Sequence, residues 1–413
     1  MLYFFYKNII EINFVRFILD TLKFITMIKN INPAKFLSPV LVLTSIILFT
    51  NCKKDAKSSS ELISTSSIKT KKVAYSYTIG TNAFYLEDAL PAGYVKDGSA
   101  DYTSYIQSVL SRYSEVVFPG FPLLINSQGL SVPSNRRIHF LDGSVLKLKP
   151  TTSNYYNIIK IERASYVTLI NPVIIGDNAT HSTAGGRAGR GISLFSASNV
   201  TINNPKVSNC YGDGIYVGRS SGDLPYCKTV KLKNAFCKNN SRNGISIICV
   251  DGLQVLKAYC GYSGLTGFDI EGNYGDEQQK NMSISDVTTE RNAFNGFTIA
   301  LSRTYAPYDK TIGLIEVINH KDISSQNYSF KCTLGDPADG MGTVTGTVNV
   351  VNPVWIKPGS GRPNYNRVAS GGFKTYISNP SVQNLSGTWL SDAAIVDLLD
   401  LNIKYDTFVQ LIF

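Results

Sequence analysis

A short apolar segment that begins with glycine returns along the middle of the chain. It reads GISL, GIYV, GISI, GFDI and GFTI, and a similar segment without glycine, IIKI, begins at Ile158. The glycines are separated by 23, 30, 23 and 29 residues, and they are Gly191, Gly214, Gly244, Gly267 and Gly296. A unit of this length is too short for a pair of helices. The repeat therefore predicts a parallel β-solenoid in which each unit adds one coil.

A second apolar position fixes the register of these coils. Val167, Val200 and Leu253 each lie nine residues after the first residue of their segment, and each begins another short strand. Val230 and Met282 are the corresponding residues of the two other coils, but they lie 16 and 15 residues after the first residue of their segment. The extra residues of those two coils are therefore expected as inserts at one corner of the solenoid.

Strand alternation assigns each position of the segment to one side of the sheet. The residue after each glycine points inward, which gives the column Ile192, Ile215, Ile245, Phe268 and Phe297. The next residue points outward, which gives the column Lys160, Ser193, Tyr216, Ser246, Asp269 and Thr298. Two residues further on, a second outward column is Glu162, Phe195, Gly218, Ile248, Glu271 and Ala300. Asp269 and Glu271 should therefore lie on one face of one strand.

The segment before the repeats predicts a single helix. Asp101 or Thr103 can cap it, and the helix should end before a strand at 116–118. Its apolar stripe is Ile106, Val109, Leu110 and Tyr113. Because the open end of a solenoid exposes strand edges and apolar side chains, this helix is expected to cover that end.

The first 52 residues have the pattern of an export signal. Lys29 and Lys35 precede an apolar run at 36–50, which is short for a membrane span, and Asn51 and Cys52 follow it. The pattern resembles a bacterial lipoprotein signal, in which Cys52 carries the lipid after cleavage. An uncleaved anchor helix is the alternative, and either Met1 or Met27 could be the start.

These observations predict three parts. Residues 1–51 form the leader, and residues 52–72, which are rich in Ser, Lys and Thr, form a flexible tether. Residues 73–413 form a single β-helix domain, with the cap and first coils at 73–150, regular coils at 151–301, and irregular coils with a C-terminal cap at 302–413. The expected location is the bacterial cell envelope, at the outer membrane or cell surface, with the lipid on Cys52 as the membrane contact.

Charge and cysteine content add two expectations. Without residues 1–51 the chain keeps 35 basic and 28 acidic residues, a net charge of +7 that suits an anionic partner or plain solubility. No dense basic run with interleaved aromatics occurs, so nucleic acid is not expected as a partner.

Cys237 and Cys260 lie seven residues after Val230 and Leu253, the corresponding strand residues of their coils. They should therefore stack on adjacent coils, as an inward ladder of thiols rather than a disulfide.

The region before the repeats resembles a known superfamily. The segment DGSADYTSYIQSVLSR, followed by VVFP and LSVPSN, is similar to the N-terminal region of the pectate-lyase superfamily, with matches at Asp97-Gly98, Asp101, Thr103 and Ile106-Gln107. Together with the coils up to Ala300, the resemblance covers roughly 200 residues. It implies a right-handed parallel β-helix that acts on polysaccharides, with a structural role for Asp97 and Asp101. It does not indicate which sugar.

Candidate chemistry gathers on three consecutive coils. Asp213, Tyr216, Arg242, Asp269 and Glu271 are expected to span about 10 Å, roughly two strand spacings. Carboxylates about 6.5–9.5 Å apart can serve as acid and base in inverting glycoside hydrolysis. The three carboxylates could instead hold Ca²⁺ against an acidic sugar while Arg242 acts as base or charge partner in an elimination. Outward polar residues without a function are the ordinary alternative.

Further residues are candidates for substrate binding. The glycine-rich loop 181–190 carries Arg187 and Arg190, which could bind uronate or sulfate groups, although a mobile surface connection would look the same. The remaining candidates are Tyr216, Asn243, Asn273 and Asn295. The three histidines, His139, His181 and His320, are far apart in sequence, so no zinc site is expected.

The motifs decide the order of the functional hypotheses. The polygalacturonase branch of the superfamily carries paired aspartates, Gly-His-Gly and Arg-x-Lys, whereas this chain has only GDG at 212–214. An arginine near acidic residues matches the lyase branch better. We therefore predict an enzyme that cleaves an acidic, uronic-acid-containing polysaccharide by β-elimination, with calcium as its candidate cofactor. A hydrolase or epimerase that uses the same face is the second hypothesis, and a non-catalytic glycan-binding surface protein is the third.

Overall fold

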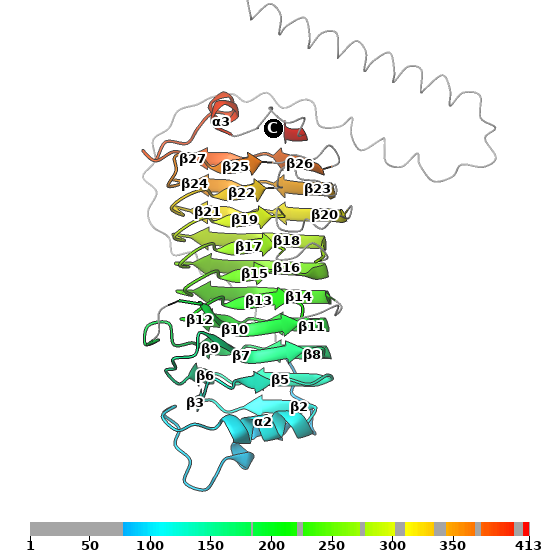
Figure 1. The fold of residues 1–413 in the computed structure, drawn as a ribbon, viewed down its shortest axis with the longest axis vertical. Helices are drawn as coiled ribbons and strands as arrows, with labels where there is room; N and C mark the ends of the chain where they lie inside the picture. The colour runs from blue at the N-terminus through cyan, green and yellow to red at the C-terminus, as the bar shows by residue number, and fades with distance from the viewer. Residues whose placement is uncertain are drawn as a thin grey trace, which may run out of the picture. The chain divides into compact units, whose positions relative to one another are not determined.

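The computed structural model describes residues 77–182, 185–220, 226–272, 277–301, 310–333, 344–367, 373–399 and 408–412. The chain divides into two compact units, residues 1–74 and 75–413, and all described residues belong to the second. They form a right-handed parallel β-helix, as predicted, whose coils stack one above another (Figure 1). The predicted leader and tether, with Cys52, lie outside the described residues.

One wall of the solenoid is a nine-stranded parallel sheet that contains the glycine segments. Its strands in spatial order are β4 (Leu130–Ser131), β7 (Tyr155–Glu162), β10 (Ala188–Phe195), β13 (Ile215–Gly218), β15 (Ile245–Ile247), β17 (Phe268–Glu271), β19 (Phe297–Ala300), β22 (Phe330–Thr333) and β25 (Asn364–Arg367).

A nineteen-stranded parallel sheet forms the remaining walls. Its first row is β1 (Phe84–Tyr85), β2 (Glu115–Phe118), β5 (Arg136–Phe140), β8 (Ser165–Ile170), β11 (Ser198–Asn203), β14 (Cys227–Lys238), β16 (Val250–Gly261), β18 (Gln279–Glu290), β20 (Lys310–Ile318), β23 (Val344–Val351), β26 (Phe373–Ser378) and β28 (Phe408–Ile412). Its second row is β3 (Pro122–Ile125), β6 (Val145–Leu148), β9 (Val173–Ile175), β12 (Lys206–Ser208), β21 (Lys321–Ile323), β24 (Val354–Ile356) and β27 (Ser381–Gln383). The long strands β14 and β18 pair with both rows, and β16 pairs with β14 and β18, so the two rows join into one sheet.

The register follows the sequence landmarks. Val167, Val200, Val230, Leu253 and Met282 are consecutive strand partners. The inward column after the glycines is fully buried, and two of its members, Phe268 and Phe297, stack with ring centroids 4.7 Å apart. The repeat therefore predicted both the pairing and the core.

The inserts of the longer coils occupy one corner, as expected. The chain crosses directly from β10 to β11 and from β15 to β16, but longer connections at 219–226 and 272–278 separate β13 from β14 and β17 from β18. Both connections follow directly after strands of the nine-stranded sheet.

The coils after residue 301 are more regular than the sequence suggested. Phe330 pairs with Phe297, and Asn364 pairs with Phe330, so the nine-stranded sheet continues for two further coils. The repeat was overlooked because Ser329 and Pro363 stand where earlier coils have glycine.

A row of asparagines lines one turn of the solenoid. Asn171, Asn204 and Asn234 have positive φ angles of 56°, 52° and 52°, a conformation in which Asn is favoured over most residues. Asn204 Nδ2 donates to Asn171 Oδ1, and Asn234 Nδ2 donates to Asn204 Oδ1, both over 2.8 Å. The ladder resumes from Asn319 to Asn352 and Asn379. These amides tie successive coils together along the edge.

Helix α2 (Thr103–Arg112) lies at the N-terminal end of the stack and buries Ile106, Val109 and Leu110, as predicted (Figure 1). Asp101 Oδ1 accepts a hydrogen bond of 2.9 Å from the Thr103 backbone N–H. The expectation for Tyr113 was wrong: it lies after the helix, is 37% exposed, and stacks on Phe84. Two further short helices are η2 (Leu86–Ala89) and, in the C-terminal region, α3 (Asp392–Leu398).

The cysteines match the ladder interpretation. Cys237 and Cys260 are direct strand partners, and both are fully buried free thiols.

Candidate functional site

The outward column of the nine-stranded sheet is almost completely buried from Ser193 to Thr298. Ser193, Ser246, Asp269 and Thr298 are at most 6% exposed, and Tyr216 is 9% exposed. Alternation placed these side chains on the correct side of the sheet, but it gave no sign of what covers them. They form a polar layer outside the apolar core, not a solvated surface.

Part of the cover comes from amide side chains that precede the strands. Asn243 Nδ2 donates to Ser246 Oγ over 3.0 Å, and Asn295 Nδ2 donates to Thr298 Oγ1 over 2.9 Å. Both amides lie three residues before the hydroxyl and fold back over it. This Asn-Gly-x-Ser/Thr spacing is a sequence signal for the burial of the outward column.

Asn243 also links two of the three carboxyl groups of the site, those of Asp213 and Asp269. Its Nδ2 donates to Asp269 Oδ2 over 3.0 Å, and its backbone N–H donates to Asp213 Oδ1 over 3.2 Å. Its Oδ1 accepts from the Thr266 backbone N–H over 3.0 Å, which fixes the orientation of the amide. Asn243 is 2% exposed and therefore acts within the protein, as the residue that positions Asp269.

The carboxyl group of Asp269 has a different protonation preference from a carboxylate on the surface. Burial raises the pKa of Asp269 well above its usual value, and the nearby carboxylates of Glu271 and Asp213 raise it further. The positive charges of Arg242 and Lys331 act in the opposite direction but do not offset the burial. Asp269 therefore tends to keep its proton, whereas Glu271, two residues along the same strand, has a side chain that is 21% exposed.

Two arginines and two carboxylates form a chain of charges across the site. Arg190 Nε lies 3.7 Å from Asp213 Oδ2, and Arg242 Nε lies 3.8 Å from Asp213 Oδ1. Arg242 Nη2 lies 3.8 Å from Glu271 Oε1. All three separations exceed a direct hydrogen bond.

These long separations leave buried polar atoms without hydrogen-bond partners in the described part of the chain. Arg190 Nε and Asp213 Oδ2 are two such atoms. Buried polar groups are rarely left unpaired, and unpaired ones indicate a place for water or a ligand. The guanidinium groups of Arg190 and Arg242 are thus oriented by carboxylates while their N–H groups stay available.

Aromatic rings surround Arg190. Its guanidinium lies 4.0 Å from the ring centroid of Tyr216, 5.5 Å from that of Tyr155 and 5.8 Å from that of Phe195. Phe195 and Tyr216 also pack with Ile248 as a small apolar cluster separate from the main core. Burial raises the pKa of the Tyr216 hydroxyl, so this group is a hydrogen-bond donor and not a base.

The loop that carries Arg187 and Arg190 is anchored by a buried histidine. His181 Nδ1 lies 2.9 Å from Asp177 Oδ2, its Nε2 lies 3.2 Å from Asn154 Oδ1, and its side chain is 1% exposed. The His181 ring stacks on Tyr211 with centroids 3.5 Å apart, and Tyr211 OH donates to Gly185 O.

Arg187 ties the same loop to a later coil. Its Nη1 donates to the Ser241 backbone carbonyl over 3.0 Å. Described residues at both ends of the loop are thus bonded to other coils.

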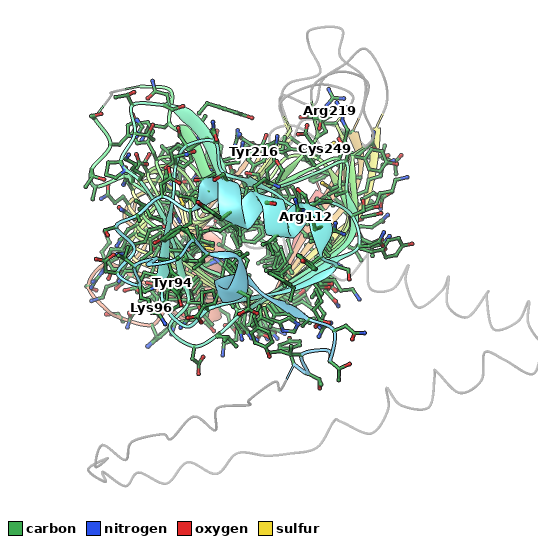
Figure 2. All side chains as sticks on the ribbon, turned by 90° about the horizontal axis from the view of Figure 1, so that it is seen from below. Tyr94, Lys96, Arg112, Tyr216, Arg219 and Cys249 are labelled. Atoms are coloured by element: carbon green, nitrogen blue, oxygen red, sulfur yellow. The ribbon has the colours of Figure 1, made fainter. Side chains whose placement is uncertain are left out.

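Described residues of two inserts contact each other. Arg219 Nε lies 3.6 Å from Glu277 Oε1, so residues from two inserts approach each other beside the sheet. Viewed along the solenoid axis, Tyr216 and Arg219 lie on the same side of the solenoid, while Tyr94 and Lys96 lie across the molecule (Figure 2).

The candidate residues separate into three groups. Asp213, Arg190, Arg242, Asp269 and Glu271 come together with Tyr216 and Asn243, as described above. Asn295 is 1% exposed, and both atoms of its amide are bonded within the protein, to Thr298 and to the Tyr328 backbone N–H, which favours a structural role over substrate binding. Asn273 lies outside the described residues.

The sequence did not suggest two features of this region. Tyr156 OH donates to Asp177 Oδ1 over 2.6 Å and so completes the anchor around His181. Lys331, one of the charges that act on Asp269, belongs to a coil that the sequence repeat did not reveal.

No group of three or more His, Cys, Asp or Glu side chains suited to a metal ion occurs among the described residues. Arg242 lies between Asp213 and Glu271, where the calcium hypothesis would place the ion. Calcium binding by Asp213, Asp269 and Glu271 therefore stays a prediction.

Comparisons with known proteins identify the fold but assign no family. The sequence matches no protein-family profile. It is 28% identical over 275 residues to YclG, an uncharacterized protein of Bacillus subtilis (strain 168), and the match covers 56% of this chain and 47% of YclG. The chain thus spans about half the length of that relative.

Two solved structures have a similar fold. The N-terminal fragment of gene product 12 of bacteriophage Phi29 superimposes with a TM-score of 0.53 at 16% identity, over 72% of this chain and 62% of the other. Tailspike protein gp49 of the Acinetobacter baumannii bacteriophage Fri1, a capsular polysaccharide depolymerase, superimposes with a TM-score of 0.52 at 12% identity, over 81% of this chain and 64% of the other. At these identities the likeness shows a shared β-helix fold.

Proposed function

We propose that this protein is a polysaccharide-active enzyme whose active site is the outward face of the nine-stranded sheet around Asp269 and Glu271. The observation that carries the proposal is the contrast between the two carboxyl groups. Asp269 is buried and tends to be protonated, whereas Glu271 is partly exposed and close to Arg242. A buried carboxyl that keeps its proton can act as the acid, beside a more exposed carboxyl on the same face that acts as the base.

The preferred reaction is β-elimination on an acidic polysaccharide. Arg190 and Arg242, whose N–H groups are available, bind the uronate carboxylate and neutralise its charge. Glu271 takes the proton from the carbon next to that carboxylate, and the electron pair forms a carbon–carbon double bond. The bond to the glycosidic oxygen breaks, and Asp269 gives its proton to that oxygen. Arg242, which lies between two carboxylates, serves as the charge partner and not as the base.

Hydrolysis is the second candidate, and the same pair of carboxyls favours it. Asp269 would protonate the glycosidic oxygen while Glu271 activates a water molecule. Elimination is preferred because two arginines beside the pair suit a substrate that is itself anionic.

The test distinguishes these reactions. The purified protein is incubated with pectic, alginate and glycosaminoglycan polysaccharides, with and without a chelator, and both unsaturated-uronate absorbance and new reducing ends are followed. Elimination produces both signals, and hydrolysis produces reducing ends alone. A loss of either signal with the chelator would support the calcium hypothesis. Binding without products, unchanged by Asp269→Asn and Glu271→Gln, would leave only a glycan-binding role at some other surface.

The cell-envelope location and the lipid on Cys52 also remain proposals. No helix in the described residues is long and apolar enough to span a membrane. Mass spectrometry of the mature N-terminus tests the lipid directly, because a lipidated Cys52 at the first position supports the proposal and an unmodified Met1 contradicts it.

A further inference from the structure

The outward column continues beyond the carboxyl pair into coils that the repeat did not reveal. Asp269 pairs with Thr298, Thr298 pairs with Lys331, and Lys331 pairs with Tyr365. Lys331 therefore lies two strand spacings, about 10 Å, from Asp269 on the same face.

Lys331 is held among aromatic rings. Its Nζ lies 5.6 Å from the ring centroid of Phe294 and 5.9 Å from that of Tyr365. Tyr365 in turn packs on Tyr328 with centroids 5.3 Å apart, and Phe294 is 42% exposed. No carboxylate in the described part of the chain forms an ion pair with Lys331.

The opposite side of the carboxyl pair has the same combination of groups. Arg190 lies among the rings of Tyr155, Phe195 and Tyr216. The coil that contains Arg190 is three strand spacings away from the coil that contains Asp269. The acidic pair is thus flanked along the solenoid axis by two positions at which a cation is presented by aromatic rings. The distance from the Arg190 coil to the Lys331 coil is about 24 Å, or five strand spacings.

We propose that Lys331, Phe294 and Tyr365 form a second anion-binding subsite, which takes an acidic sugar of a chain that runs along the solenoid axis across Asp269 and Arg190. The inference rests on the proposed function and specifies its substrate as an extended polyanionic saccharide. Lysine supplies the charge for a carboxylate or sulfate group, and the rings supply apolar contact for the sugar. Binding at both subsites places the intervening linkage beside Asp269 and Glu271.

The arrangement predicts a dependence on chain length. An acidic chain that reaches both subsites gains a second charged contact without a second loss of translational freedom, so it should bind more tightly than a short one. A neutral chain of equal length should gain little. The gain should also fall with ionic strength, because a partly exposed charge pair is screened by salt.

The test measures binding by calorimetry to the full chain carrying Asp269→Asn, so that turnover does not interfere. The probes are galacturonate and mannuronate trimers and hexamers, with maltohexaose as the neutral control. Lys331→Gln tests the charge, Lys331→Arg tests its rescue, and Phe294→Leu tests the ring. Lys321→Gln is the matched control, because Lys321 is an exposed lysine on β21 of the other sheet.

The expected result is that Lys331→Gln weakens hexamer binding about tenfold and abolishes the gain over the trimer. Lys331→Arg should restore most of it, and Lys321→Gln should change nothing. Unchanged hexamer binding in Lys331→Gln would overturn the subsite and leave the proposed function in place. Failure of every acidic hexamer to bind would contradict both. Circular dichroism of each variant confirms that the fold is intact.

Discussion

Asn243 donates a hydrogen bond of 3.0 Å to Oδ2 of Asp269, and the same amide nitrogen donates to Ser246 Oγ. The amide can donate to this carboxyl oxygen whether the carboxyl is charged or neutral, so it fixes the geometry of Asp269. Burial and the neighbouring carboxylates then set its protonation. Because Asn243 positions the carboxyl group and Asp269 reacts, substitutions at the two residues can test the two roles separately.

Replacing the proton donor should stop the chemistry without stopping binding. Asp269→Asn keeps the shape of the side chain but cannot give up a proton, so kcat should fall by a factor of about 10²–10⁴. The dissociation constant for an acidic hexamer should change little. Steady-state kinetics together with calorimetry separate the two effects, and a variant with wild-type kcat would remove Asp269 from the mechanism.

Replacing the positioning residue should have a weaker and different effect. Asn243→Ala removes the hydrogen bonds to both Asp269 and Ser246, so kcat should fall less than in Asp269→Asn and the pH profile should shift. Asn295→Ala is the matched control, because it removes the equivalent bond to Thr298 two coils further on. Equal losses of kcat in both variants would indicate that Asn243 acts only through the stability of the fold.

The loss of activity at high pH should reflect the ionisation of Asp269. Its pKa in the folded protein is raised, so the neutral acid persists above the usual carboxyl range and is lost only as the pH rises through this raised value. Activity should therefore fall at high pH as Asp269 ionises. A profile of kcat against pH tests this, and an alkaline limb that persists unchanged in Asp269→Glu would contradict it.

A buried polar network predicts an unusual dependence of stability on pH. Burial lowers the pKa of His320 to about 3, and burial raises the pKa of Asp322 to about 6. His320 binds its proton more readily in the unfolded chain, so its stabilising effect is lost as pH falls from 6.5 towards 3. Asp322 binds its proton more readily in the folded chain, so its effect is lost as pH rises from 3.8 through 6. The two slopes oppose each other between about pH 4 and 6.

Single substitutions should expose each slope. In His320→Gln the free energy of unfolding should fall as pH rises from 4 to 6, and in Asp322→Asn it should fall as pH decreases over the same range. Each slope should be at most about 1.4 kcal/mol per pH unit. Urea midpoints measured at several pH values give the result, and parallel profiles for the two variants would refute the assignment.

The anchor of the arginine loop predicts a selective effect on substrate binding. His181→Gln removes the contact with Asp177, so the loop that carries Arg187 and Arg190 should loosen and KM for an acidic substrate should rise. His139→Gln is the matched control, because His139 is also buried and lies 2.7 Å from Glu115, far from the site in the coil order. Both variants should lose stability, but only the first should raise KM.

The fold could be predicted from the sequence because every coil meets the same packing requirement. Each coil needs an inward apolar residue after a glycine, and residues such as Ile192 and Phe297 satisfy that need at regular intervals. The rule failed after residue 301, where Ser329 and Pro363 replace glycine while the pairing of Phe330 continues. Glycine is thus favoured at this position but not required, and the residue after it is buried even where it is the polar Asn364.

The site was only partly predictable for a related reason. Alternation places Asp269 and Glu271 on one face, since it depends on the strand alone. The burial of Asp269 depends on residues such as Asn243, which precedes another strand and contacts Asp269 only in the folded chain. Lys331 was missed with its coil, although its effect reaches Asp269.

The most direct test of the central claim compares product formation from uronic-acid polysaccharides by the wild-type protein, Asp269→Asn and Glu271→Gln. Glu316→Gln, on β20 of the other sheet, is the control. We predict that the wild type and the control generate unsaturated uronate at the same rate, and that both site variants lose at least about a hundredfold. Wild-type rates in both site variants, or no product from any acidic polysaccharide, would contradict the account.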